Sequence, residues 1–234
     1  MSASSTTALE VRGLLCERGS LVLQARHLAL AAGVFHLLQG EAGEGRDCLL
    51  RVLGLLEEPD DGEVLIEGES VRGLSEDARL RRRERRLGFI FAAPFLLPAL
   101  SVIENVAMPL FKISDVEAAE ARRRSEELLE FAGIPDLAQT PCADLPPLAQ
   151  HRVSLARALV NEPAALLVEN LDGALAGENL HAFSALLRQA APRFGIAVIA
   201  AASAAFAPEP ADRVIEVRQG AVVCRDELLP KTDT

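Results

Sequence analysis

The sequence predicts an α/β domain built on a mixed sheet, with parallel strands at its centre and an antiparallel flank. Four segments are short and almost wholly apolar, as in strands that are buried on both faces: residues 34–39, 88–91, 165–168 and 196–201. Longer segments with helical patterns separate them, as expected where helices cover a parallel sheet. Near the start of the chain, residues 21–30 and 63–67 show some alternation of apolar and polar positions, which favours strands of the flank.

A helix is predicted over residues 115–132. Ser114 and Glu117 form a capping-box pattern at its start, and Gly133 followed by Pro135 is a typical stop.

A second helix is predicted over residues 148–161 and ends before Pro163, because proline lacks the backbone N–H that a helix interior needs. Toward the end of the chain, strands at 213–217 and 221–224 flank a turn and predict a hairpin.

Length and composition indicate one globular domain. The chain has 234 residues, of which 50% are hydrophobic, enough for a continuous core. We expect a flexible tail over residues 1–8, a single domain over 9–226 with a helical subdomain at about 93–150, and a C-terminal tail over 227–234. The net charge of −10 argues against a nucleic-acid partner. With neither a signal peptide nor a membrane span recognisable, the expected location is cytoplasmic.

A glycine-rich loop follows the first predicted core strand. Residues 40–47 read GEAGEGRD and precede a helical run at 48–56. This is the setting of a phosphate-binding loop, because glycine lets backbone N–H groups converge and the helix N-terminus adds positive potential. The nucleotide-binding residues predicted here are Gly40, Gly43, Gly45, Arg46 and Asp47.

The side chains of this loop are poorly suited to ATP. Such a loop uses Lys to reach the phosphates and Ser or Thr to bind Mg²⁺, whereas Arg46 and Asp47 stand in those places. Three carboxylates, on Glu41, Glu44 and Asp47, outnumber the one guanidinium. At ~5 Å and an effective dielectric near 20, each uncompensated pair with a phosphate charge repels by about 3 kcal/mol before screening. ATP and Mg²⁺ are therefore expected to bind weakly, and a plain strand-to-helix turn is the alternative.

The stretch at residues 81–110 is the most specific in the chain and reads RRRERRLGFIFAAPFLLPALSVIENVAMPL. It resembles ABC transporter ATPases of the lipoprotein-release and macrolide-export type, in which a glutamine ends the strand and LLP-x-L-T-x-x-ENV-x-x-P follows. The resemblance implies a P-loop NTPase-like ABC nucleotide-binding domain whose segment after the strand lies near a membrane permease. The docking residues that it implies are Phe95, Leu96, Leu97, Pro98, Glu104 and Asn105.

The same resemblance brings other family positions into register over residues 9–224, and most of them are replaced. Ala92 stands for the glutamine, and residues 145–149 read LPPLA where the family has LSGGQ. The two prolines also remove two N–H donors from the start of the following helix.

The residues that would serve hydrolysis are replaced as well. Glu169 stands where the family has the aspartate that organises Mg²⁺, and with Asp47 it is the predicted metal pair. Asn170 takes the place of the general base and cannot accept a proton from water near neutrality. Ser203 replaces the histidine that senses the γ-phosphate, and Ala176 replaces an aspartate. Arg18 stands where an aromatic residue stacks on adenine.

Together these positions predict an ABC-type subunit that docks on a permease, as a homodimer or beside an active ATPase, with hydrolysis lost or strongly impaired. Two alternatives stay open: a slow but working Mg-ATP-hydrolysing ATPase, in which Arg46 holds phosphates and Glu169 organises Mg²⁺, and an interaction module no longer tied to transport.

Overall fold

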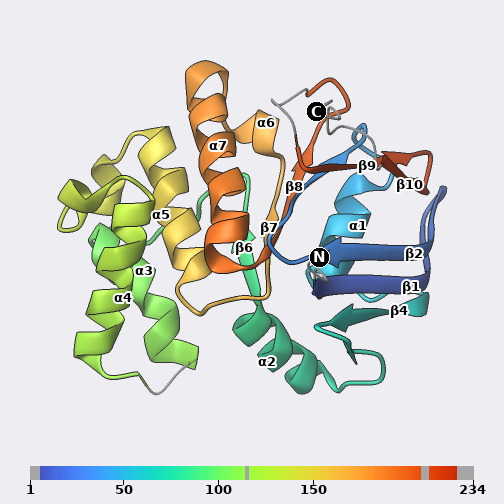
Figure 1. The fold of residues 1–234 in the computed structure, drawn as a ribbon, viewed down its shortest axis with the longest axis horizontal. Coiled ribbons are helices and arrows are strands. Elements are labelled where there is room, and N and C mark those ends of the chain that lie inside the picture. Colours follow the sequence, from blue (N-terminus) through green and yellow to red (C-terminus); the bar gives the residue numbers. More distant parts are fainter. Residues whose placement is uncertain (1–5, 114–115, 207–210, 226–234) are drawn as a thin grey trace, which may run out of the picture.

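The computed structural model describes residues 6–113, 116–206 and 211–225 and contains one ten-stranded mixed sheet (Figure 1). The strands are β1 (Thr7–Arg18), β2 (Leu21–Ala31), β3 (Phe35–Gln39), β4 (Asp61–Ile66), β5 (Glu69–Ser70), β6 (Leu87–Ile90), β7 (Ala165–Val168), β8 (Ala197–Ala202), β9 (Arg213–Arg218) and β10 (Ala221–Arg225). The helices are α1 (Arg46–Leu53), α2 (Glu76–Arg86), α3 (Val102–Ile113), α4 (Ala118–Phe131), α5 (Pro147–Leu159), α6 (Leu171–Ala174) and α7 (Gly177–Phe194), with 3₁₀ turns at Pro135–Leu137 and Cys142–Asp144.

The sheet has the two parts that the sequence predicts. Its strand order is β5-β4-β1-β2-β10-β9-β3-β8-β7-β6, and the strands from β9 to β6 run parallel to one another. The flank of β1, β2, β4 and β5 is antiparallel, and β9 and β10 form the predicted hairpin. The α/β fold with a mixed sheet is therefore confirmed.

Two hydrophobic clusters cover the two faces of the sheet. Leu37 of β3 packs in one cluster with α3, α4, α5 and α7, whereas its neighbour Leu38 packs in the other with α1 and the flank strands. Figure 1 shows the helical subdomain of α3, α4 and α5 to one side and α1 beside the flank. Because consecutive strand residues point to opposite faces, the short apolar runs supply both clusters at once.

Several element boundaries differ from those predicted. β1 begins at Thr7 and Ala8 is buried, so the ordered domain starts two residues before the expected position 9. Residues 1–5 and 226–234, the greater part of the predicted tails, lie outside the described residues. α5 ends at Leu159, four residues before Pro163.

The helix predicted at 115–132 is α4. Its start is Ala118, its N-cap Glu117 makes no side-chain cap bond, and the predicted cap Ser114 lies outside the described residues. Gly133 follows the helix with a φ of +69°, so the predicted stop is confirmed. None of the helices in the described ranges combines the length and apolar character that a bilayer crossing requires.

His36 lies in the central strand β3 and is fully buried. Its Nε2 donates to the backbone oxygen of Ala31 at 3.2 Å, while Nδ1 has no partner within the described chain. Burial lowers the pKa of His36 from 6.5 to about 4, so the folded protein holds this imidazole neutral.

We expect the free energy of unfolding to fall by about 2 kcal/mol between pH 7 and pH 5, because unfolded His36 takes up a proton that the folded state excludes. The folded pKa lies below the unfolded one, so the contribution is present above pH 6.5 and is lost as the pH falls toward 4. Urea unfolding of the wild type and His36→Leu at both pH values measures it. The free energy of unfolding of the variant should change less between the two pH values, by about 2 kcal/mol. An equal change in both proteins would mean that His36 is not the group responsible.

Candidate functional site

The glycine-rich loop of residues 40–47 joins the carboxyl end of β3 to α1, as predicted. Gly45 is the N-cap of α1 and has a φ of +110°, which L side chains rarely adopt. A Cβ at Gly40 would lie 2.6 Å from the backbone oxygen of Val217, so this position also requires glycine. Gly43 has a φ of +84° at the loop tip. The backbone is thus that of a strand-loop-helix cradle.

The guanidinium of Arg46 folds back onto its own loop. It is 6% exposed, and its Nε and Nη2 atoms each lie 2.8 Å from Oδ1 of Asp47. Nη1 donates to the backbone oxygen of Gly40 at 3.2 Å. The only cation of the loop is therefore neutralised by the residue next to it.

Two other carboxylates of the loop border a cavity of about 470 Å³. Glu41 and Glu44 line it from the loop, and Arg218 lines it from the end of β9 but pairs with Glu216 at 3.0 Å. With Arg46 already paired, a polyphosphate at this loop would meet carboxylates without a free partner. The residues present fit Mg-ATP poorly, so no catalytic step through it follows from this geometry.

The predicted metal ligands Asp47 and Glu169 have other partners. Asp47 holds Arg46, and the Oε2 atom of Glu169 accepts a hydrogen bond from the backbone N–H of Ala92 at 3.3 Å. Within the described ranges, no group of three or more His, Cys, Asp or Glu residues gathers as a metal site.

Asn170 and Ser203 are both built into the backbone structure at the ends of β7 and β8. Asn170 is the N-cap of α6 in a left-handed conformation, with a φ of 46°. The backbone N–H of Ser203 donates to both carboxylate oxygens of Asp172, at 3.1 and 3.2 Å, and its hydroxyl donates to Oδ2. Asp172 therefore ties α6 to the end of β8, a role that sequence reasoning missed because the partner lies 31 residues away.

Residues 145–149, which stand where the family has LSGGQ, form the start of α5 and provide no polar cap. Pro146 is the N-cap and Pro147 the first helical residue, and no side chain caps this end. Gln150 donates instead to the backbone oxygen of Leu145 at 2.8 Å, which closes the turn on itself. This helix end offers fewer N–H donors to a phosphate than the serine and glycine of the family pattern.

Arg18, the predicted adenine platform, is held by the loop after α1. Its guanidinium pairs with Asp60 at 2.8 Å and Glu57 at 3.3 Å and donates to the backbone oxygen of Glu58. The edge of the guanidinium is thus occupied, and a stacking ligand could use only its face.

The segment predicted to contact a permease, residues 94–105 and here called the docking segment, presents apolar side chains to solvent. Phe95 is 69% exposed and adopts a φ of +46°, and Leu97 is 42% exposed. Pro98 is also exposed, whereas Leu96 packs partly against the core. Behind the segment, α3 and α4 border a groove of about 440 Å³ lined by Met108, Phe111 and others.

Asn105 is a correction to the docking prediction, because its side chain is 1% exposed and cannot touch a partner. It accepts a hydrogen bond from the N–H of Leu97 at 2.8 Å and donates to the carbonyls of Leu97 and Ser101 at 3.0 Å. Glu104 accepts from the N–H of Ser101 at 2.8 Å, as in a capping box. Asn105 therefore fixes the shape of the docking segment from within, and the exposed Glu104 holds the turn at Ser101 from the surface.

Arg157 of α5 joins the docking segment to the helix that follows the signature region. Its Nη2 atom donates to the backbone oxygen of Pro94 at 2.7 Å, and Nη1 donates to that of Phe95 at 2.9 Å. Ser154 adds a hydrogen bond to Pro94 at 3.3 Å. Arg157 is half-buried, and this burial lowers the pKa of its guanidinium, for which the carbonyls of Pro94 and Phe95 are the acceptors.

Comparison with known proteins places the chain in a family. The model of the ABC transporter family matches residues 23–171. The lipoprotein-releasing system ATP-binding protein LolD of Maricaulis maris is 37% identical over 81% of this chain and 83% of that protein. LolD of Bacteroides fragilis is 31% identical over 92% of this chain and all of the relative.

Solved structures share the fold. A bacterial ABC transporter cassette, solved as a dimer, has a TM-score of 0.75 and 25% identity over 92% of this chain and 96% of its own. CbiO1 of Clostridium perfringens, part of an ABC transporter complex, has a TM-score of 0.83 and 22% identity over 93% of this chain and 87% of its own. The chain therefore belongs to the ABC transporter family and is a homologue of the LolD ATP-binding proteins.

Proposed function

We propose that this chain is an ABC transporter ATP-binding-protein homologue that docks on a membrane permease and has lost, or nearly lost, ATP hydrolysis. It serves there as a scaffold or regulatory subunit on the cytoplasmic side of the membrane. The observation that carries the proposal is the pairing of Arg46 with Asp47, which removes the one positive side chain that the loop could offer to a phosphate.

Electrostatic repulsion weakens the binding of nucleotide at this loop. Mg-ATP brings about two net negative charges to a loop whose only guanidinium is neutralised, and within the described part of the chain Glu41 and Glu44 take part in no ion pair. At ~5 Å each such encounter costs about 3 kcal/mol before screening, which is enough to weaken binding by orders of magnitude. Asn170 supplies no general base, so bound nucleotide would also turn over slowly.

The partner is an integral-membrane permease together with a second ATP-binding subunit. The chain's LolD relatives belong by name to a lipoprotein-releasing system, and a related cassette is known as a dimer, which supports an assembly of this kind. A homodimer and a heterodimer with an active ATPase are both consistent with the proposal. The exposed side chains of Phe95, Leu97 and Phe111 supply the apolar surface that a permease segment would cover.

The wild-type chain should show no measurable heat with millimolar Mg-ATP in calorimetry and no turnover above that of an Arg46→Ala variant. Asp47→Ser should raise the affinity at least about tenfold, because it releases Arg46 and supplies a hydroxyl for Mg²⁺. Titration calorimetry of both proteins checks the affinity, and a phosphate-release assay checks the turnover.

The matched control is Glu178→Ser, which removes an exposed carboxylate from the first turn of α7 and should leave the affinity unchanged. Steady hydrolysis by the wild type that disappears in both Arg46→Ala and Glu169→Ala would support the slow ATPase instead.

Phe95→Ser and Phe111→Ser should each reduce co-purification of the chain with its permease from solubilised membranes several-fold, with an unchanged melting temperature. Both side chains are more than half exposed, so their loss removes contact area without opening the core. Quantitative pull-down with mass spectrometry of the permease measures the effect.

Val22→Ser is the control for this experiment, since Val22 is a 44% exposed apolar residue on β2, outside the docking segment. Equal losses in all three variants, or no loss in any, would argue against docking through the segment at 94–105 and the α3–α4 groove.

A further inference from the structure

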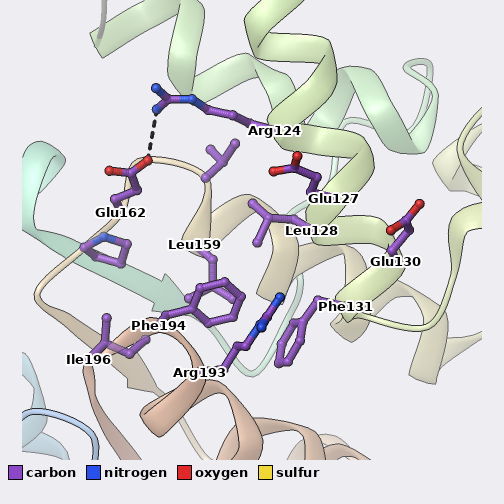
Figure 2. Close-up of a pocket in the computed structure, with 12 residues that line it drawn as sticks. Arg124, Glu127, Leu128, Glu130, Phe131, Leu159, Glu162, Arg193, Phe194 and Ile196 are labelled. Carbon is purple, nitrogen blue, oxygen red and sulfur yellow. Dashed lines mark ion pairs between the residues drawn. The ribbon is translucent and has the colours of Figure 1, made fainter.

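A deep hollow on the described surface lies away from the glycine-rich loop. It is a cleft of about 880 Å³ at the junction of the helical subdomain with the core, here called the α4–α7 cleft (Figure 2). One wall is the last two turns of α4, the other is the end of α7, and the loop after α5 closes one side. Its volume is in the range of clefts that hold small molecules.

The floor of the cleft is apolar. Leu128, Leu159 and Ile196 are all less than 10% exposed, and they lie beneath two aromatic rings. The rings of Phe131 and Phe194 meet edge to face with centroids 4.9 Å apart, so each wall contributes one ring. A flat apolar group can therefore pack against this pair without any rearrangement of the core.

The rim of the cleft holds two opposite charges that do not pair with each other. Arg124 is not one of these two, because it forms ion pairs with Glu162 at 3.2 Å and with Glu120 at 2.7 Å. Among the described residues, neither Arg193 on the α7 wall nor Glu130 on the α4 wall takes part in an ion pair. In Figure 2 the guanidinium of Arg193 rises beside both rings, and the carboxylate of Glu130 stands on the facing wall.

We propose that the α4–α7 cleft binds a small zwitterion with an aromatic side chain, an amino acid or short peptide. Its carboxylate meets Arg193, its ammonium meets Glu130, and its ring packs against Phe131 and Phe194. A ligand with both charges satisfies both walls at once, whereas a purely cationic or anionic ligand leaves one of them unused. Since α4 and α7 contribute opposite walls, the bound ligand also bridges the helical subdomain and the core.

The binding site is tested with L-phenylalanine as the probe, by a chemical-shift titration of the ¹⁵N-labelled full chain. Saturable shifts should appear at the residues of the cleft, with a dissociation constant on the order of 1 mM for a ligand of this size. N-acetyl-phenylalanine lacks the cation and phenylalaninamide lacks the anion, so each should bind about threefold to fivefold more weakly, the size expected of one exposed charge contact.

The variants assign each charge to its wall. Arg193→Gln should weaken the binding of L-phenylalanine by the same factor and leave the binding of phenylalaninamide unchanged. Glu130→Gln should also weaken the binding of L-phenylalanine, but leave that of N-acetyl-phenylalanine unchanged. Arg26→Gln, which removes an exposed arginine of β2 remote from the cleft, should change neither.

Two results would overturn the proposal. One is the absence of saturable shifts at the cleft up to the solubility limit of L-phenylalanine. The other is equal binding of all three compounds, which would mean that the rings hold the ligand and the charges do not. The readout is binding alone, so either result leaves the proposal about ATP hydrolysis and permease docking standing.

Discussion

Burial of the central strands on both faces is the constraint on which the rest of this structure depends. β7 and β8 contain no exposed residue, and consecutive residues of β3 enter opposite clusters. A polar group placed there would lose its hydrogen bonds to water without gaining others, at a cost of several kcal/mol. This part of the sequence is therefore restricted by folding alone, whether or not the protein hydrolyses ATP.

The loops at the carboxyl ends of these strands are under no such restriction, and three of their polar groups are hydrogen-bonded within the chain. Arg46 pairs with Asp47, Asp172 holds Ser203, and Glu169 accepts from Ala92. In an ABC ATPase, side chains at this edge must keep donors and acceptors available for a ligand. Here Arg46, Glu169 and Ser203 are instead hydrogen-bonded within the chain, which favours a rigid platform over a binding site at these positions.

The central strands, the hairpin and the strand-loop-helix at residues 40–47 could be predicted because each has a local pattern. α7 also has one, since Phe183, Leu186, Leu187, Ala190 and Ala191 recur at helical spacing on its buried face, and it could have been found by the same reasoning.

The contacts of the site are different in kind. Nothing in the residues around Asn105 reveals that its amide lies inside the docking segment, and nothing near Arg157 reveals two carbonyl partners more than 60 residues away. Such side chains look like surface groups in a linear reading, because their neighbours come from distant parts of the chain. The direction of the Arg46 side chain could not be predicted from the sequence either, because a guanidinium of that reach can point into a ligand site or back onto its own loop.

The hydrogen bonds of Arg157 have a geometric consequence. A planar guanidinium that donates to two consecutive carbonyls fixes the orientation of the peptide between them as well as its distance. The backbone at Phe95 and the helix α5 are therefore tied at one point. A change in the direction of the Pro94–Phe95 peptide would have to break or lengthen at least one of these two hydrogen bonds.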